Sequence, residues 1–300
     1  KVLWTILKYR PTIIYCYADI PLFTTFGWNA FFKFRLIYDM RGDILNEWKV
    51  RGKSSLEQFL LKCIYSAAIK KVDLIFSVSA TFPQNISCKV KPKYNYYDGD
   101  IFYFDERKSN LLRRYLELED RFIFVYSGNT LYYQMLEENI RFFAQVYKKY
   151  FHAYLILLTE FEHDILEKEL SKYNIPSSAY IIKSLPQHEV SDLQSIADIG
   201  LLIRDDLPLN HNAFPTKFCE YLASGVPVLM TPHIHTLVPI VKNYNLGKIV
   251  TLKDDYSKDI DELYESRKQK DVKQLCSKFA AANLMWQKKA KDIYKLITIT

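Results

Sequence analysis

Residues 214–232 read FPTKFCEYLASGVPVLMTP, and this stretch decides the fold. Pro215 suits the first position of a helix, because its fixed φ fits there and its missing N–H costs nothing. Gly225 suits the left-handed position just past the end of a helix, and Pro227 prevents the helix from continuing. The stretch therefore predicts a helix of about ten residues, followed directly by a short apolar strand at residues 227–231.

The predicted helix has two distinct faces. Phe218, Tyr221 and Leu222 lie three and four positions apart and form an apolar stripe that we expect to be buried. Lys217 and Glu220 lie together on a different face, close to the start of the helix. The placement of these two charged residues is the feature that needs an explanation.

The loop before this helix is polar and follows a predicted strand that ends at Arg204. In open parallel sheets ligands bind at the carboxyl ends of strands, and a helix N-terminus offers unpaired N–H groups with a partial positive charge. Those groups and Lys217 could bind a diphosphate, and Glu220 could accept hydrogen bonds from ribose hydroxyls. The alternative is that Lys217 and Glu220 are solvated surface residues, and the pattern alone leaves both interpretations open.

The rest of the chain alternates short β-branched or aromatic runs with longer helical patterns, which is typical of parallel sheets covered by helices. Strands are predicted at 12–18, 34–40, 73–79 and 88–92, and then at 121–127, 153–159, 179–185, 198–204, 227–231 and 247–252. The residues at 56, 59, 60, 63, 64 and 67 fall at helical spacing between the second and third strands. We therefore predict an α/β protein with an incomplete first domain over residues 1–103, a complete second domain of about six parallel strands over 104–270, and a C-terminal helix over 271–300 that packs back across the first domain.

Composition limits the function classes. With 300 residues and 49% hydrophobic content, the chain can bury a large core. The sequence has no apolar run of membrane-spanning length and no export signal, so we expect a cytoplasmic protein. The five cysteines are scattered, without the close spacing of a zinc site or redox pair, and we expect reduced thiols.

The net charge of +7 permits anionic partners. No nucleic-acid-binding motif is present, so we expect no nucleic acid partner. Ordinary surface lysines and attraction to an anionic membrane surface both account for the charge. The aromatic clusters YNYY (94–97) and LYY (131–133) favour an acceptor at the inner membrane face, with the protein bound peripherally.

The segment PTKFCEYLASGVPVL resembles the most diagnostic segment of the family 4 glycosyltransferases, also called group 1 glycosyltransferases. Four further stretches are similar to family segments in the same order: IYDMRGDILNEW (37–48), DLIFSVSATF (73–82), YNYYDGDIFYFD (94–105) and FVYSGNTLYYQ (124–134). The resemblance covers essentially the whole chain. It implies the GT-B architecture, two Rossmann-like domains that face each other, with the acceptor bound by the first domain and the donor by the second.

The resemblance also implies an activity and a set of site residues. The activity is that of a retaining, metal-independent hexosyltransferase that moves a sugar from a nucleotide-diphosphate sugar to a glycan or lipid-linked acceptor in surface polysaccharide biosynthesis, with no cofactor besides the donor substrate. Glu220 would bind the ribose, while Lys217 and Arg204 would stabilise the leaving diphosphate. The remaining residues assigned in this way are Pro215, Thr216, Gly128, Asn129 and Asn212 on the donor side, and Asp39 and Arg41 on the acceptor side.

The sequence departs from the family pattern at three places. Asn212 stands where many members have a glutamate that contacts the donor sugar. No Arg and Lys follow Gly128 where many members have a phosphate-binding pair, and a glycine-rich turn is missing from the first domain. We therefore expect the first strand or two of that domain to lie outside these 300 residues.

Two alternative functions and one alternative site remain open. The chain could be a non-catalytic remnant that binds nucleotide sugars, or a nucleotide-sugar epimerase on the same fold. The sequence DGD at 98–100 is similar to the metal site of the other large glycosyltransferase architecture. Because it falls in an interdomain segment here, we expect no metal site.

Overall fold

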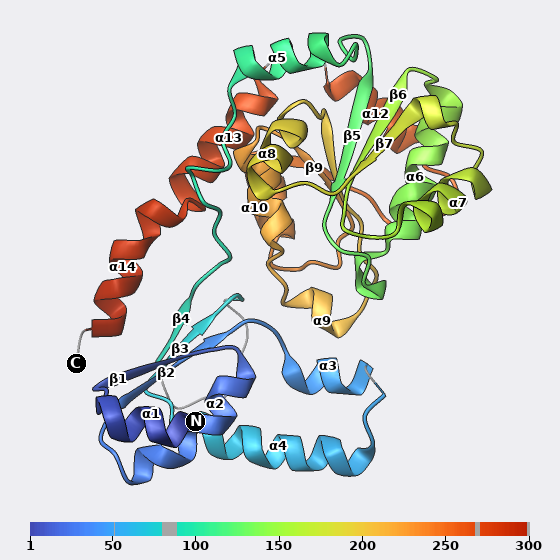
Figure 1. Ribbon diagram of the computed structural model, residues 1–300. Coiled ribbons are helices and arrows are strands. Elements are labelled where there is room, and N and C mark those ends of the chain that lie inside the picture. The colour runs from blue at the N-terminus through green and yellow to red at the C-terminus, as the bar shows by residue number, and fades with distance from the viewer. Residues whose placement is uncertain (51, 80–88, 268–270, 299–300) are drawn as a thin grey trace. The chain divides into compact units, whose positions relative to one another are not determined.

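The computed structural model describes residues 1–50, 52–79, 89–267 and 271–298. The chain divides into two compact units, which are coloured along the chain in Figure 1. Unit 1 contains Lys1–Tyr94, Pro208–Phe214 and Ile297–Thr300, and unit 2 contains Asn95–Leu207 and Pro215–Leu296. Both units are built on parallel sheets, and the predicted α/β class with two Rossmann-like domains is confirmed.

The sheet of unit 1 has four parallel strands in the order β1-β2-β3-β4. They are β1 (Ile13–Tyr17), β2 (Arg35–Met40), β3 (Leu74–Ser77) and β4 (Lys89–Pro92). All four were predicted, although Cys88, at the start of the fourth prediction, lies outside the described residues. The helices of this unit are α1 (Val2–Tyr9), α2 (Asp19–Thr25), α3 (Ile44–Val50), α4 (Ser55–Ile69) and α9 (Pro208–His211), with a 3-10 turn η1 (Phe26–Ala30).

The start of α4 shows why that helix forms where the sequence predicts it. The Ser54 hydroxyl accepts a hydrogen bond from the backbone N–H of Glu57, at 3.3 Å, and the Glu57 carboxylate accepts one from the backbone N–H of Ser54, at 2.9 Å. This reciprocal arrangement is a capping box, which satisfies two backbone donors that the helix itself cannot. Leu61, Ala68 and Ile69 are the residues that α4 buries.

The sheet of unit 2 has six parallel strands in the order β10-β9-β8-β5-β6-β7. They are β5 (Phe122–Ser127), β6 (Ala153–Leu158), β7 (Tyr180–Lys183), β8 (Ile199–Leu202), β9 (Val228–Met230) and β10 (Gly247–Ile249). All six predicted strands are confirmed. The chain runs outward from β5 in one direction and from β8 in the other, so the strand order reverses between these two neighbours. That point is where open α/β sheets bind ligands.

Helices flank the six-stranded sheet, with α8 and α10 on one side and α6 and α7 on the other (Figure 1). Their bounds are α5 (Glu106–Tyr115), α6 (Leu136–Lys149), α7 (His163–Lys172), α8 (Gln187–Ser195), α10 (Thr216–Ala223), α11 (Val238–Tyr244), α12 (Ser257–Ser266), α13 (Val272–Asn283) and α14 (Trp286–Thr298), with 3-10 turns η2 (Tyr132–Gln134) and η3 (Ser177–Ala179). Phe122, Phe124 and Phe143 are fully buried in the core between sheet and helices.

Helix α10 is fixed to the centre of the sheet by Tyr221. The Tyr221 hydroxyl accepts a hydrogen bond from the backbone N–H of Ser127, at 2.8 Å. Its ring packs on Gly200 in β8, where an added Cβ would lie only 2.6 Å from a ring carbon. Gly200 therefore has to be a glycine, because any side chain there would displace the ring that positions α10 across β5 and β8.

The division into units differs from the predicted domain limits at two places. Residues 95–103 belong to unit 2, because the backbone of Tyr97 is hydrogen-bonded to Leu284 and Trp286. The segment Pro208–Phe214 belongs to unit 1, where the ring of Phe214 stacks on Tyr94 with centroids 4.5 Å apart.

The predicted C-terminal helix is two helices in the structure. Helix α13 packs against α10 within unit 2. The end of α14 belongs to unit 1, where Arg35 Nη1 donates a hydrogen bond to the carbonyl of Ile297 at 2.8 Å. The C-terminal segment thus contributes to both units.

The cluster YNYY is not the free aromatic surface that we expected. Tyr97 is only 3% exposed, and the ring of Tyr96 packs 6.1 Å from that of Trp286. These rings, together with the stacked Tyr94, are parts of the packing, and only the LYY cluster keeps exposed members, Leu131 and Tyr132. In the described part of the chain, no helix is long and apolar enough to cross a membrane.

Candidate functional site

The candidate site lies where β5 and β8 end, at the reversal of the strand order. The chain leaves β5 through Gly128, which has a φ of +138°, a value that favours glycine. An added Cβ at Gly128 would lie 3.0 Å from the Nζ atom of Lys217. Gly128 and Lys217, both predicted donor-site residues, are therefore in close contact.

Lys217 is buried, with only 8% of its surface exposed. Its Nζ donates a hydrogen bond to Oε1 of Gln134 at 2.8 Å and lies 4.2 Å from the centre of the Tyr126 ring. Burial and the nearby Arg204 hold the pKa of Lys217 well below its usual range. The interpretation of Lys217 as a solvated surface residue is therefore wrong.

Arg204 is the second buried cation, with 4% of its surface exposed. Its Nη1 donates to the carbonyl of Tyr133 at 2.8 Å, and its backbone N–H donates to the Thr231 hydroxyl at 3.0 Å. Burial lowers the pKa of Arg204 as well. Within the described ranges, neither Arg204 nor Lys217 forms an ion pair with a carboxylate. Asp205 and Glu220 attract Arg204 and Lys217, respectively, but burial still lowers the pKa of both cations. A bound anion would therefore stabilise them further.

Glu220 lies one turn further along α10. Burial raises its pKa to about 7, and Lys217 opposes that rise. Its carboxylate has no hydrogen-bond partner among the residues that the structure describes. A partly buried carboxylate with free acceptor sites is suited to bind a pair of hydroxyls.

The N-terminus of α10 has no side-chain cap. Pro215 is the N-cap residue, with a ψ of 134°, and the helix begins at Thr216, so our placement of Pro215 inside the helix was wrong by one position. A proline has no side-chain group that could cap, and no side-chain cap hydrogen bond is present. The N–H of Phe218 donates to the carbonyl of Pro215 at 3.1 Å. The N–H groups of Thr216 and Lys217 come before it, at the positive end of the helix dipole, where an anion is favoured. The other end agrees with the prediction, since Gly225 has a φ of +75°.

A sequence model of the family described as "Glycosyl transferases group 1" matches residues 108–280, which is more than half of the chain. The chain belongs to this family. Residues 108–280 include all the site residues described above.

Solved structures place this group 1 glycosyltransferase among GT-B enzymes. It resembles sucrose-phosphate synthase from Thermosynechococcus elongatus, with a TM-score of 0.76 and 14% identity over 98% of this chain and 75% of that one. It also resembles Anabaena HepE in complex with UDP-glucose, with a TM-score of 0.75 and 16% identity over 99% of this chain and 80% of that one. A third similar structure is WaaG, a glycosyltransferase involved in lipopolysaccharide biosynthesis, with a TM-score of 0.67 and 12% identity over 91% of this chain and 80% of that one. At these identities the likeness is one of fold. No curated protein sequence matches the chain.

Of the other donor-side predictions for this glycosyltransferase, Thr216 is exposed at the start of α10. Asn129 makes the turn after β5, where its carbonyl accepts a hydrogen bond from the Tyr126 hydroxyl at 2.7 Å. Asn212 lies in the segment 208–214 of unit 1. The structure therefore brings Gly128, Arg204, Lys217 and Glu220 together within unit 2.

The role of Gln134 was not predicted from the sequence. This glutamine is 7% exposed in the 3-10 turn η2, and its side chain holds the Lys217 ammonium group. A single glutamine in a short turn gives no periodic signal. Its place after the LYY cluster drew attention to the aromatic rings instead.

On the predicted acceptor side, Asp39 is fully buried in unit 1. Its Oδ2 accepts hydrogen bonds from Nζ of Lys93, at 2.6 Å, and from the Tyr15 hydroxyl, while Arg41 Nη1 lies 3.4 Å from Oδ1. The Arg41 side chain is 24% exposed and lies over the ring of Tyr17. Asp39 therefore positions its neighbours, and Arg41 is the member of the pair that a ligand can reach.

The DGD sequence forms a turn. Oδ1 of Asp98 accepts hydrogen bonds from the side chain of Gln287, at 2.6 Å, and from the backbone N–H of Asp100, at 3.0 Å. Over the described residues, no group of three or more His, Cys, Asp or Glu side chains is arranged to hold a metal ion.

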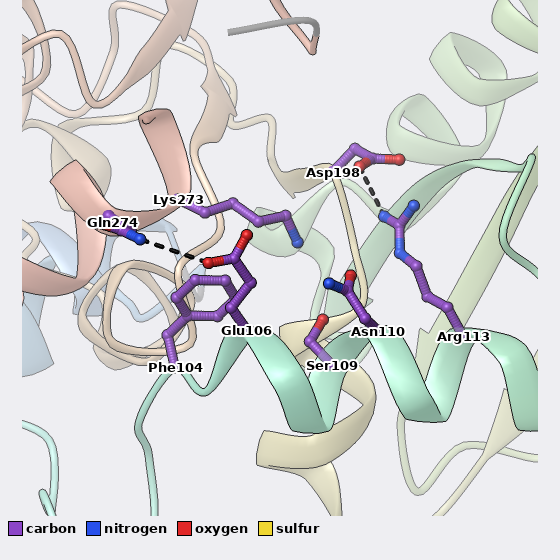
Figure 2. Close-up of a pocket in the computed structure, with 8 residues that line it drawn as sticks. All are labelled: Phe104, Glu106, Ser109, Asn110, Arg113, Asp198, Lys273 and Gln274. Atoms are coloured by element: carbon purple, nitrogen blue, oxygen red, sulfur yellow. Dashed lines mark hydrogen bonds and ion pairs between the residues drawn. The ribbon is translucent and has the colours of Figure 1, made fainter. Parts of the chain in front are cut away.

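A second pair of cations, Lys273 and Arg113, lies near the amino end of β8 in unit 2 and has a structural role. Lys273 lines a cavity of about 130 Å³, with Glu106 and Gln274 beside it (Figure 2). Its Nζ donates to the carbonyls of Ser195, the last residue of α8, at 2.9 Å, and of Ala197, just beyond the helix, at 2.5 Å.

Arg113, on the same cavity, donates to the carbonyl of Ile196 at 2.8 Å and pairs with Asp198 at 2.6 Å (Figure 2). Lys273 and Arg113 thus satisfy the last carbonyls of a helix, where cations are favoured. The Lys217 ammonium group donates to a neutral amide, lies near an aromatic ring and has Glu220 nearby without an ion pair. This difference separates the candidate ligand site from a structural site.

Proposed function

We propose that the protein is a retaining hexosyltransferase that uses a nucleotide-diphosphate sugar and binds it at the carboxyl edge of the sheet in unit 2. One observation carries this proposal. Lys217 lies beside Gly128 in the first turn of α10, which has no side-chain cap, and the buried Arg204 is close enough to lower the pKa of Lys217. Neither cation forms an ion pair with a carboxylate within the described residues. A diphosphate supplies the negative charge that this arrangement lacks.

The same residues account for catalysis of transfer. When the bond from the sugar to the diphosphate breaks, negative charge grows on the leaving phosphate oxygens. Lys217, Arg204 and the first N–H groups of α10 are already fixed in place to stabilise it, which is the most effective form of electrostatic catalysis. Glu220 would hold the ribose hydroxyls and so orient the donor. In this scheme no metal ion is needed, and an oxygen of the donor phosphate takes the acceptor proton.

The acceptor is proposed to be a glycan or lipid-linked sugar of surface polysaccharide biosynthesis, with Arg41 of unit 1 among the residues that contact it. Support for this class comes from the family and from fold relatives such as WaaG, whose title names lipopolysaccharide biosynthesis. UDP-glucose is the first donor to test, because HepE, which has a similar fold, was solved with it.

Slow hydrolysis of the donor in the absence of acceptor tests the proposal. A transferase releases UDP and free glucose from UDP-glucose, and a retaining one releases the α-anomer first, which proton NMR resolves before mutarotation. Lys217→Met should abolish this release. Conversion of the sugar to its epimer without release of UDP would show an epimerase instead.

A second candidate function is nucleotide-sugar binding without transfer. It is favoured by Asn212, an amide where many family members have a carboxylate. Binding of UDP-glucose with no release of UDP, over a range of acceptors and after long incubation, would support that function and reject the transferase.

A further inference from the structure

Helix α4 of unit 1 has two opposite apolar faces. One face, with Leu61, Ala68 and Ile69, is buried within the unit. The other face points to solvent, and we call it the α4 stripe. Its members are the residues whose helical spacing was evident in the sequence: Leu56, Phe59, Leu60, Cys63, Ile64 and Ala67, all exposed.

The exposure of the α4 stripe is large for apolar residues. Leu56 is 67% exposed, Phe59 is 63%, Leu60 is 51% and Ile64 is 43%. A helix that is apolar on all sides is normally buried on all sides, and a contiguous exposed apolar patch marks an interaction surface. The α4 stripe is therefore a candidate interaction surface.

The charge of unit 1 indicates which kind of partner this is. Residues 1–94 contain 15 Lys and Arg but only 6 Asp and Glu, a net charge of +9, whereas the rest of the chain has 26 against 28, a net charge of −2. The basic excess of the protein thus belongs to the unit that carries the exposed apolar helix. An anionic partner is attracted to this unit and not to unit 2.

Basic residues also stand at both ends of the α4 stripe itself. Lys53 precedes the helix, and Lys70 and Lys71 follow its last turn, all of them exposed. Lys70 and Lys71 form no ion pair within the part of the chain that the structure describes. Lys53 forms an exposed ion pair with Glu57 at 3.1 Å. An apolar stripe with phenylalanine and leucine, flanked by lysines, is typical of helices that lie in the interface of an anionic bilayer.

Helix α1 of the same unit has a similar composition. Trp4 is 60% exposed and Tyr9 is 65% exposed, and the ammonium group of Lys8 lies within about 5 Å of both rings, at 4.7 and 5.1 Å from their centres. Tryptophan and tyrosine are the side chains that prefer the level of lipid headgroups. Unit 1 therefore has two exposed helices that suit a membrane surface.

We propose that the α4 stripe binds the surface of an anionic membrane, with α4 lying in the plane of the interface. The stripe enters the acyl boundary, and the lysines at its ends contact lipid phosphates. This proposal concerns unit 1 and stands independently of donor binding in unit 2.

Co-sedimentation of the full chain with vesicles tests the proposal. We expect binding to phosphatidylcholine vesicles that contain phosphatidylglycerol, and much weaker binding to pure phosphatidylcholine. The double variant Lys70→Gln/Lys71→Gln should reduce the partition coefficient by about fivefold per lysine at low salt. Phe59→Ser should reduce it by about tenfold or more, because a large apolar side chain no longer enters the bilayer.

Ile165→Ser is the matched control, since Ile165 is 44% exposed on α7 of unit 2. It should bind vesicles like the wild type. Because Phe59 is on the surface, Phe59→Ser should keep the melting temperature and the hydrolysis of UDP-glucose, so that a failure here is distinct from a failure of the proposed function.

Two results would overturn the proposal. The first is absence of wild-type binding to anionic vesicles at low salt, or wild-type binding that Phe59→Ser leaves unchanged. The second is a dimer by light scattering that Phe59→Ser dissociates, because the partner of the α4 stripe would then be a second copy of the chain.

Discussion

The substitution Lys217→Met should weaken donor binding and leave the fold at least as stable as before. In the donor complex proposed here, the ammonium group contributes a charge-assisted hydrogen bond to a phosphate, worth about 1.5–3 kcal/mol. Its loss corresponds to a Kd for UDP that is about ten- to a hundredfold higher.

The effect on stability has the opposite sign because Lys217 is buried beside another cation. Replacing buried charged groups by apolar side chains of similar volume stabilises proteins by up to about 4 kcal/mol, and the attraction of Glu220 for Lys217 reduces that gain. Against this stand the hydrogen bond to Gln134, about 1 kcal/mol, and the contact with the Tyr126 ring, about 1–2 kcal/mol. The net is a gain of about 1 kcal/mol, or a rise in Tm of about 2–4 °C for a unit of this size.

Isothermal titration with UDP and a thermal melt of the ligand-free protein measure the two effects. Lys273→Met is the matched control, because Lys273 is also a buried lysine of unit 2 but donates to two carbonyls at the end of α8. It should lower Tm, because the carbonyl of Ala197 loses this donor at a cost of about 1–3 kcal/mol, while the carbonyl of Ser195 keeps a hydrogen bond from the Ser109 hydroxyl. The Kd for UDP should stay unchanged. The reasoning is refuted if Lys217→Met binds UDP with wild-type affinity, or if Lys273→Met loses affinity by the same factor.

Three further predictions concern the same site. The pKa of Glu220 in the folded protein, about 7, is above its unfolded value, so Glu220 stabilises the ligand-free protein fully below about pH 4, and this contribution is lost as the pH rises through 7. The affinity for UDP should rise over the same range, because the carboxylate forms. Thermal melts and UDP titrations at pH 5 to 8 measure these two pH dependences, and both should be weaker in Glu220→Gln. In Gly128→Ala, an alanine must adopt a positive φ, and its Cβ lies 3.0 Å from Nζ of Lys217. The variant should lose about 1–3 kcal/mol of unfolding free energy in urea and bind UDP more weakly. Wild-type stability and affinity would contradict the contact with Lys217. Tyr221→Phe removes the hydroxyl that accepts a hydrogen bond from the buried N–H of Ser127 at 2.8 Å, and the free energy of unfolding in urea should fall by about 1–3 kcal/mol. An unchanged unfolding midpoint would show that this hydrogen bond does not hold α10 in place.

The strands were predictable from the sequence because buried parallel strands have a plain signature. A strand covered by helices on both faces, such as β5, is a continuous apolar run, and all six of its residues are buried. The end of α10 was also predictable, because a glycine that can adopt a positive φ and a proline two residues later end a helix through local backbone geometry alone. Gly225 and Pro227 have these positions.

The burial of Lys217 was not predictable from helical periodicity. Periodicity places charged residues on the solvent side, and the sequence does not reveal that β5 and its following turn cover this face of α10. The resemblance to the family pointed to Lys217 and Glu220, while the structure adds Gln134 and Tyr126, which act on Lys217 from positions about 80–90 residues earlier in the chain.

The assignment of Pro208–Phe214 to unit 1 also depends on distant contacts. These residues follow β8 of unit 2 in the chain, so a prediction by sequence order places them in the second domain. The stacking of Phe214 on Tyr94 instead joins them to unit 1. A contact between residues so far apart has no counterpart in local propensity or spacing.

The central claim is that the diphosphate of the donor binds at the N-terminus of α10. A crystal structure of the protein with UDP tests it most directly, through the distance from Nζ of Lys217 to the nearest phosphate oxygen. We predict about 2.7–2.9 Å, the length of a charge-assisted hydrogen bond, with the ribose hydroxyls on Glu220. UDP bound elsewhere, for example at the cavity beside Lys273, with Lys217 still held by Gln134 alone, would contradict the account.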